Sequence, residues 1–413
     1  MSDLVKPFAA LRPRRGYAGE VIAPPYDVVS TDEARALANG RPWSFLHVSR
    51  PEIDLPRATD PHAEAVYQRG TENLERLRKS EILTREPIPS FYVYRMRMGR
   101  HEQTGFACVA SVRAYEKNII RKHELTRPDK ENDRVRNIEA LNAQTGPVLM
   151  AYRSDEALRD LLREGTRQLP LFEVEGPNEV THTVWQVGSA AFVERLTAAV
   201  NALGALYIAD GHHRSAAAAR VAEARRRLAG GASRESASYE YFLSVAFPHD
   251  EMRIFDYNRV VSDLGGLTPA AFLERLGEIF RVEPAAGRAK PVRAATFGMY
   301  LTGQWYTLAL PVDAIPDDPV ASLDVSLLQD LVIGPVLGIE NPRTDQRIDF
   351  VGGVRGLEEL ERRVDGGAAI AFAMYPTSME QLMTVADAAK LMPPKSTWFE
   401  PKLADGLLSH VLD

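Results

Sequence analysis

The sequence predicts an α+β protein in which helices and strands are mixed along the chain. Apolar residues recur at helical spacing in some segments, alternate with polar residues in others, and Gly- or Pro-containing turns separate the segments. The chain has 413 residues, 45% hydrophobic and 26% charged, which is typical of a globular protein. We expect two domains: residues 1–264, a catalytic region with an inserted hairpin and helices, and residues 265–413, an α/β domain whose tail returns to the active site.

Local patterns place the elements in chain order. Ser30 and Glu33 have capping-box spacing, so a helix should follow Ser30 and stop at Gly40. Further helices are predicted at residues 62–82, 128–141, 155–163 and 189–203. Strands are predicted at residues 90–98, 105–115, 148–152, 239–247 and 252–261, the first two as a hairpin. After residue 265 we expect a helix, a strand pair with Trp305 near its turn, and two more helices.

Composition excludes several classes of protein. A formal net charge of −6 argues against a nucleic-acid-binding surface, because phosphate-backbone binding usually leaves a basic footprint. The one cysteine, Cys108, excludes an internal disulfide framework and a Cys-rich zinc site. No apolar run is long enough to span a bilayer, and the first residues lack the apolar core of a signal peptide. We therefore expect a cytoplasmic protein.

Residues 205–220, read as ALYIADGHHRSAAAAR, carry most of the functional information. An apolar strand ends at Asp210, Gly211 lets the backbone approach a ligand, and an Ala-rich helix begins at once. The first N–H groups of a helix attract anions, and the two imidazoles and the guanidinium group of this turn add donors and charge. Alternatively, one histidine is buried and satisfied while Arg214 pairs with a carboxylate. The predicted phosphate-binding residues of the turn are Gly211, His213, Arg214 and Ser215.

A second cluster, residues 121–134, begins RKHELT and places cations, an imidazole, a carboxylate and a hydroxyl close together. This density suits a site that binds a polyanion and needs one general base, although a charged surface loop would read the same way. The predicted phosphate-binding residues of this cluster are Arg121, His123, Thr126 and Arg134.

Two proline-rich motifs and one histidine are further candidates. In APPYDVV the prolines force an extended backbone from which Tyr26 and Asp27 project, as substrate contacts or as a structural turn. In PPKSTWFEPK the triplet Lys395, Ser396 and Thr397 suits phosphate binding but lacks the Gly-rich loop of a P-loop. His47 is a third substrate-binding candidate, although its surroundings equally suit a half-buried strand.

Taken together, these motifs resemble a widespread bacterial family known as a domain of unknown function. The resemblance rests on APPYDVVS, FLHVSRPEIDLP, the RKHELT block, IADGHHRSAAAAR and MPPKSTWFEPKL, which span nearly the whole chain. The DGHHR turn is similar to the phosphate-binding turn of the ParB and sulfiredoxin superfamily, which implies that fold for the core. Within that superfamily the order of a His-Glu pair and then Asp-Gly-His-His-Arg resembles free L-serine kinases.

The kinase resemblance implies roles for individual residues. Glu124 would be the general base, His212 a catalytic residue of the phosphate turn, and Asp210 a catalytic residue that places Mg²⁺. The donor would be ATP, ADP or pyrophosphate, and the acceptor free serine or a similar small hydroxy compound. A nucleotide-binding regulatory switch of ParB type and a metal-dependent phosphohydrolase remain alternatives, although adjacent histidines rarely ligate one ion. The expected partners are therefore small molecules, with no membrane and no nucleic acid, and a homodimer stays open.

Overall fold

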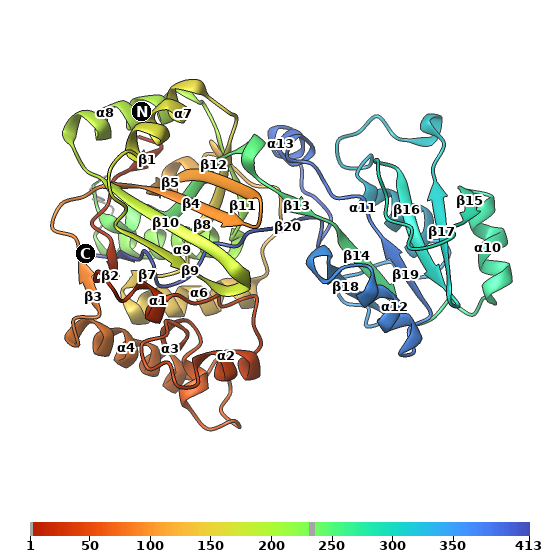
Figure 1. Ribbon diagram of the computed structural model, residues 1–413, viewed down its shortest axis with the longest axis horizontal. Coiled ribbons are helices and arrows are strands. Elements are labelled where there is room, and N and C mark those ends of the chain that lie inside the picture. Colours follow the sequence, from red (N-terminus) through yellow and green to blue (C-terminus); the bar gives the residue numbers. More distant parts are fainter. Residues whose placement is uncertain (1–2, 231–235) are drawn as a thin grey trace. The chain divides into compact units, whose positions relative to one another are not determined.

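The computed structural model describes residues 3–230 and 236–413 of the chain (Figure 1). These residues form two compact units. The first unit comprises Met1–Lys122, Thr126–Met252 and Pro401–Asp413, and the second comprises His123–Leu125 and Arg253–Glu400. The domain division expected after residue 264 stays a prediction.

A mixed sheet forms the centre of the first unit. Its strands run in the order β6-β11-β8-β12-β5-β4-β10-β9, with β1 paired to β5. Two pairs, β11 with β6 and β12 with β8, are parallel, and the others are antiparallel. The strands are β1 (Val5–Lys6), β4 (Phe91–Met98), β5 (His101–Ser111), β6 (Ile120–Arg121), β8 (Val148–Tyr152), β9 (Phe172–Glu175), β10 (Val180–Val187), β11 (Leu206–Asp210) and β12 (Tyr241–Pro248).

Helices cover both faces of this sheet. Of these, α7 packs on β5 and β10, and α9 packs on β8 and β12. Figure 1 shows α7 and α8 at one side of the unit and α2, α3 and α4 at the opposite side, where α4 packs on α6. The helices are α1 (Ala18–Val21), α2 (Thr31–Ala38), α3 (Leu46–Ser49), α4 (Glu64–Lys79), α5 (Val112–Glu116), α6 (Pro128–Leu141), α7 (Glu156–Gly165), α8 (Ala190–Ala202) and α9 (His212–Leu228). Two short strand pairs lie outside this sheet. In one, β2 (Leu11–Pro13) pairs with β3 (Leu83–Arg85), and in the other, β7 (Ala143–Gln144) pairs with β21 (His410–Val411). Strands and helices are thus mixed as predicted, and the α+β class is confirmed.

The main core of the first unit lies where the sheet meets α7 and α8. Phe106 and Met150 of the strands are fully buried in the same apolar cluster as Leu158 of α7 and Leu196 of α8. Burying side chains of this size contributes about 1.5–3 kcal/mol each, so this contact holds the strand framework rigid. The carboxyl end of β11, where the polar turn begins, is therefore carried by a well-packed sheet.

Local signals predicted many elements well. Ser30 and Glu33 form the expected capping box before α2, and α6 and β8 have the predicted bounds. The strand expected at residues 105–115 is wrong at its end, because β5 stops at Ser111. The hydroxyl of Ser111 accepts a hydrogen bond from the backbone N–H of Ala114 and so starts α5 instead.

The second unit is built on a separate antiparallel sheet in the order β15-β17-β16-β19-β14-β18. The segment expected to be one strand at residues 252–261 is two, β13 and β14, which belong to different sheets. Trp305 follows the turn of the predicted strand pair β16–β17. The strands are β13 (Ile254–Phe255), β14 (Tyr257–Val261), β15 (Arg281–Pro284), β16 (Thr296–Leu301), β17 (Gln304–Ala309), β18 (Ile348–Gly352), β19 (Ile370–Ala373) and β20 (Trp398–Phe399). The helices are α10 (Pro269–Gly277), α11 (Asp324–Leu328), α12 (Glu358–Asp365) and α13 (Met379–Asp387).

Candidate active site

The polar turn between β11 and α9 has the backbone geometry expected of a ligand-binding turn. The register of β11 against β8 shifts between Ile208 and Asp210, a bulge that re-aims the last residue of the strand. Gly211 follows as the N-cap of α9 with φ +98°. A Cβ atom there would lie 3.2 Å from Nε of Arg214, so a larger residue would be strained and would crowd that side chain. Glycine thus lets the strand turn directly into the helix.

Asp210, at the end of β11, is held in an ion pair. Nζ of Lys402 donates to its Oδ2 at 2.8 Å. Burial acts to raise the pKa of Asp210, but the charges of Lys402 and Arg214 outweigh it and hold that pKa well below its ordinary value. Asp210 is therefore ionised at neutral pH and fixes an ammonium group beside the start of α9.

The guanidinium group of Arg214 lies in a partly acidic setting. It donates to the backbone carbonyl of Pro147 and lies 3.4 Å from Oδ2 of Asp27. Burial acts to lower the pKa of Arg214, but Asp27 and Asp210 raise it above its ordinary value. The side chain of Asp27 is 39% exposed, whereas that of Arg214 is 11% exposed. The carboxylate pairing of Arg214 that the sequence left open is thus present, with a solvent-facing partner.

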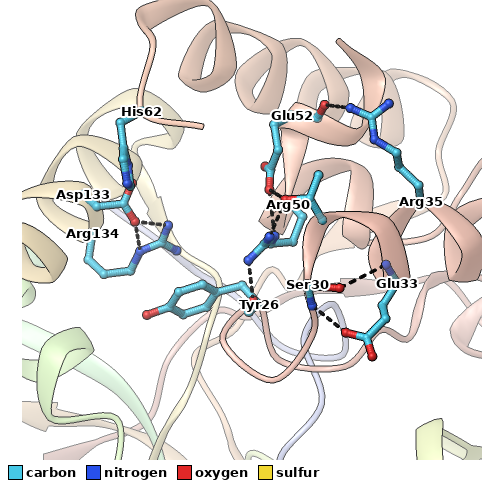
Figure 2. A network of polar contacts seen from close by, with 10 residues as sticks. Tyr26, Ser30, Glu33, Arg35, Arg50, Glu52, His62, Asp133 and Arg134 are labelled. Atoms are coloured by element: carbon cyan, nitrogen blue, oxygen red, sulfur yellow. Dashed lines mark hydrogen bonds and ion pairs between the residues drawn. The ribbon is translucent and has the colours of Figure 1, made fainter. Parts of the chain in front are cut away.

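Tyr26, Asp133 and Arg134 form a second polar group in the first unit (Figure 2). Cζ of Arg134 lies 3.8 Å from the ring centroid of Tyr26, close enough for a cation–π interaction. The same guanidinium donates to Oδ2 of Asp133 at 2.9 and 2.6 Å. Burial raises the pKa of Tyr26 to about 12, so its hydroxyl is neutral at neutral pH. Arg134 is therefore fixed in orientation by a carboxylate and by an aromatic ring.

A small cavity of about 30 Å³ joins these two groups of residues. This is enough room for about one water molecule. Tyr26, Arg134, Gly146, Arg214 and Asp405 contribute to its lining. A Cβ atom on Gly146 would lie 3.3 Å from Cδ of Arg214 and 3.5 Å from Oδ1 of Asp405, so the glycine leaves room for both side chains.

Asp405 is a buried acid that the sequence analysis missed. It is 2% exposed, and burial raises its pKa to about 7 against the opposing charge of Arg214. Backbone hydrogen bonds between Asp405 and Ala23 tie it to the segment that carries Tyr26. Lys402 was likewise missed as the partner of Asp210. Both lie in the C-terminal segment, whose one local signal was an unusual density of Pro, Lys and Gly.

The two histidines of the turn have different surroundings. Nε2 of His213 accepts a hydrogen bond from the backbone N–H of Arg127 at 3.0 Å, so the proton of a neutral ring lies on Nδ1. Burial lowers the pKa of His213, which makes the neutral form dominant at neutral pH. His212 is buried, and its carbonyl accepts a hydrogen bond from the hydroxyl of Ser215 at 3.0 Å. His213 thus contributes a donor without charge, and the hydroxyl of Ser215 is used within the helix.

The other predicted residues of the first unit lie in varied places. Arg121 stacks over the ring of Tyr207, with Cζ 5.6 Å from the centroid, and Thr126 donates to Glu131. His47 lies on helix α3, and not on a half-buried strand, with Nδ1 2.8 Å from Oδ1 of Asp54. It lines a separate groove that shares no lining residue with the cavity beside Arg214.

Five predicted residues belong to the second unit. In it, the carbonyl of His123 accepts a hydrogen bond from the backbone N–H of Met392 at 2.8 Å. The hydroxyl of Ser396 donates to the carbonyl of Pro393 at 2.6 Å, and Lys395 has a left-handed backbone with φ 59°. The grouping of these residues with the turn stays a prediction. The five are His123, Glu124, Lys395, Ser396 and Thr397.

Comparison with known proteins places the chain in a family. Residues 5–326 match the family described as "Protein of unknown function (DUF1015)". The chain belongs to the DUF1015 family. No curated protein matches this DUF1015 chain. Within the described residues, no helix has the length and apolar character needed to cross a membrane.

Several solved structures resemble this DUF1015 chain at low identity. A free serine kinase variant in complex with AMP has 12% identity and a TM-score of 0.35, covering 71% of this chain and 87% of that chain. A conserved hypothetical protein from Pyrococcus furiosus has 13% identity and a TM-score of 0.34, covering 73% and 94%. SbnI with a C-terminal truncation from Staphylococcus aureus has 11% identity and a TM-score of 0.39, covering 72% and 85%. Similarity at this level says nothing about which ligand this chain binds.

Asp210 is a poor ligand for a resident Mg²⁺ ion. Its Oδ2 is bound by the ammonium group of Lys402, and the guanidinium of Arg214 adds a second positive charge nearby. Magnesium in proteins is usually held by carboxylates free to bind it, together with water and substrate phosphates. The cations beside Asp210 would repel it. In this DUF1015 chain, Lys402 and Arg214 are therefore the cations beside Asp210 at the turn.

Proposed function

We propose that the turn from Asp210 to Arg214 binds a phosphate group and that the protein is a small-molecule kinase. One observation carries the proposal: the 17-residue helix His212–Leu228 has a glycine, Gly211, as its N-cap, so the N-cap residue itself supplies no side-chain cap. Lys402 and Arg214 place two cations beside this helix start. Backbone N–H groups at a helix start together with fixed cations form a favourable binding site for phosphate.

The proposed reaction transfers a phosphoryl group to a small hydroxy compound such as free serine. The acceptor oxygen forms a bond to phosphorus, the bond from phosphorus to the donor's bridging oxygen breaks, and the shortened donor leaves. Glu124 takes the proton of the acceptor hydroxyl. Support for this base comes from the order of His123-Glu124 and then Asp210 to Arg214, which resembles free serine kinases. Phosphoryl transfer requires mainly positioning and charge neutralisation, which Arg214 and Lys402 supply.

A kinase assay with a choice of donors tests this proposal. Purified protein is incubated with L-serine, Mg²⁺ and ATP, ADP or pyrophosphate, and phosphoserine is followed by mass spectrometry. We expect phosphoserine with at least one donor. The Glu124→Gln variant should form it at least about a hundredfold more slowly, because the general base is removed. Glu116→Gln, a change of the same kind on α5, should leave the rate unchanged.

Other outcomes would point to the competing functions. Phosphate release that does not depend on the acceptor indicates a phosphohydrolase. Tight nucleotide binding without turnover indicates a regulatory switch. Absence of product with every donor, or full activity of the Glu124→Gln variant, would contradict the proposed kinase mechanism.

A further inference from the structure

A buried arginine at the middle of β14, in the second unit, has an unusual apolar setting. The cross-strand neighbours of Arg259 are Phe350 on β18 and Phe372 on β19. Residues directly opposite one another in adjacent strands point to the same face, so the side chain of Arg259 shares its face with two phenylalanines. Only 4% of Arg259 is exposed. A charged group is thus held in an apolar part of the sheet.

The guanidinium group of Arg259 is bound by backbone carbonyl groups. It donates to the carbonyl of Tyr257 and, at 3.1 Å, to that of Lys395. Across residues 3–230 and 236–413, no carboxylate forms an ion pair with it. Burial lowers the pKa of Arg259 to about 10, so the group is still a cation at neutral pH. Buried charges in proteins are usually paired, because an isolated one is costly.

A second cation lies on the same face of β14. Lys395 is exposed, and its Nζ lies 5.6 Å from the ring centroid of Tyr257. Tyr257 and Arg259 are two residues apart on the strand and therefore point to one face. The guanidinium group of Arg259 donates to the backbone carbonyl of Lys395, so the two residues lie side by side. An anion at this face would meet a buried guanidinium group and an exposed ammonium group.

We propose that Arg259 and Lys395 form a binding site for a small oxyanion, either a carboxylate or a phosphate group. Arginine carries five N–H donors in a planar fork, of which the two carbonyls occupy only part. The remaining donors match the oxygens of a carboxylate or phosphate. This site uses neither Asp210 nor Arg214 and does not depend on the proposed kinase reaction.

Titration calorimetry on the full chain tests the site. The probes are inorganic phosphate and L-lactate, and the parent protein carries Arg214→Gln to weaken any binding at the turn of the first unit. We expect one probe at least to bind this parent. Adding Arg259→Met should weaken that binding about tenfold or more, since hydrogen bonds to a charged group are lost. Lys395→Met, an exposed change, should weaken it less, and Arg281→Met, at an exposed arginine of β15, should leave it unchanged.

Thermal unfolding separates this role from a structural one. If an anion is the missing partner, Arg259→Met should leave the Tm without anion equal or higher, and the rise in Tm with anion should disappear. The preferred probe identifies whether the group is a carboxylate or a phosphate. The proposal is overturned if neither probe binds the parent. It is also overturned if Arg259→Met binds as tightly as the parent, or if Arg259→Met lowers the Tm equally with and without anion.

Discussion

Lys402 and Asp210 form an ion pair across 192 residues of sequence, with Nζ of the lysine 2.8 Å from Oδ2 of the aspartate. Asp210 ends β11, and Lys402 belongs to the C-terminal segment Pro401–Asp413 of the same unit. That segment also supplies Asp405 to the cavity beside Arg214. The last residues of the chain therefore help to set the charge of a turn that lies in the middle of the sequence.

Removing Lys402 should destabilise the protein. In Lys402→Met the carboxylate of Asp210 loses its ammonium partner in a half-buried setting, and we expect a loss of about 2 kcal/mol in the free energy of unfolding. Because the pKa of Asp210 is lowered in the folded state, the pair stabilises the protein above the unfolded pKa of about 4. The stabilisation is lost as the pH falls through the folded pKa. Urea denaturation at pH 7 and pH 3 measures both effects.

Two further variants check the Lys402 prediction. Lys402→Arg keeps a cation and should recover most of the lost stability. The double variant Lys402→Met with Asp210→Asn should be more stable than Lys402→Met alone, because no unpaired carboxylate remains. Equal stability of the single variant and the wild type at pH 7 would show that the ion pair contributes nothing.

Asp405 should make stability fall with rising pH. Its folded pKa of about 7 lies above the unfolded value, so its contribution is fully present below about pH 4 and is lost as the pH rises through 7. Asp405→Asn resembles the protonated acid and should remove this dependence. Relative to wild type, the variant should gain about 2–4 kcal/mol between pH 4 and pH 8. Parallel stability curves for the two proteins over this range would contradict the assignment.

Gly211 should be required both for its backbone angle and for the space that it leaves beside Arg214. Gly211→Ala is expected to cost about 1–2 kcal/mol of stability, because φ is +98°. Gly204→Ala is the matched control, since Gly204 has φ +75° but no atom within 4 Å of the added Cβ. Both variants should lose similar stability, but only Gly211→Ala should also weaken phosphate binding, because its Cβ displaces Arg214. Equal phosphate affinity in the two variants would refute this steric argument.

The ring of Tyr26 should stabilise Arg134. Tyr26→Leu removes the aromatic face that lies 3.8 Å from the guanidinium, and we expect a loss of about 2 kcal/mol in unfolding free energy. Tyr26→Phe keeps the ring and should lose less than half as much. Chemical denaturation of both variants provides the measurement. If Tyr26→Phe loses as much stability as Tyr26→Leu, the hydroxyl and not the ring makes the contribution.

Sequence alone predicted the elements whose signals are local. The helix of residues 128–141 begins with a proline, and the turn at Gly211 combines a strand end, a glycine and an Ala-rich helix. The helix at Val112–Glu116 was missed, because its Ser111 cap is hidden in an apolar run. Periodicity continued across that serine, whereas one side-chain hydrogen bond decided the structure.

The partners of the candidate site could not be predicted in the same way. Lys402 binds Asp210, and Asp405 lines the cavity beside Arg214. Both contacts join segments that are distant in the sequence, and such contacts leave no pattern in either segment. The charge state of His213 was also not readable, since burial and a backbone donor from Arg127 set it. The partners of the motif and the charge state of its histidine are thus set by long-range packing.

Phosphate binding by the turn from Asp210 to Arg214 is the central claim, and calorimetry with ADP and pyrophosphate tests it most directly. Arg214→Gln should bind the preferred ligand about tenfold or more weakly than wild type, because a charged hydrogen-bond donor at the helix start is lost. Arg220→Gln, an exposed change of the same kind on α9, should bind like wild type. Equal affinity of Arg214→Gln and Arg220→Gln, or no binding of either ligand to the wild type, would contradict the claim.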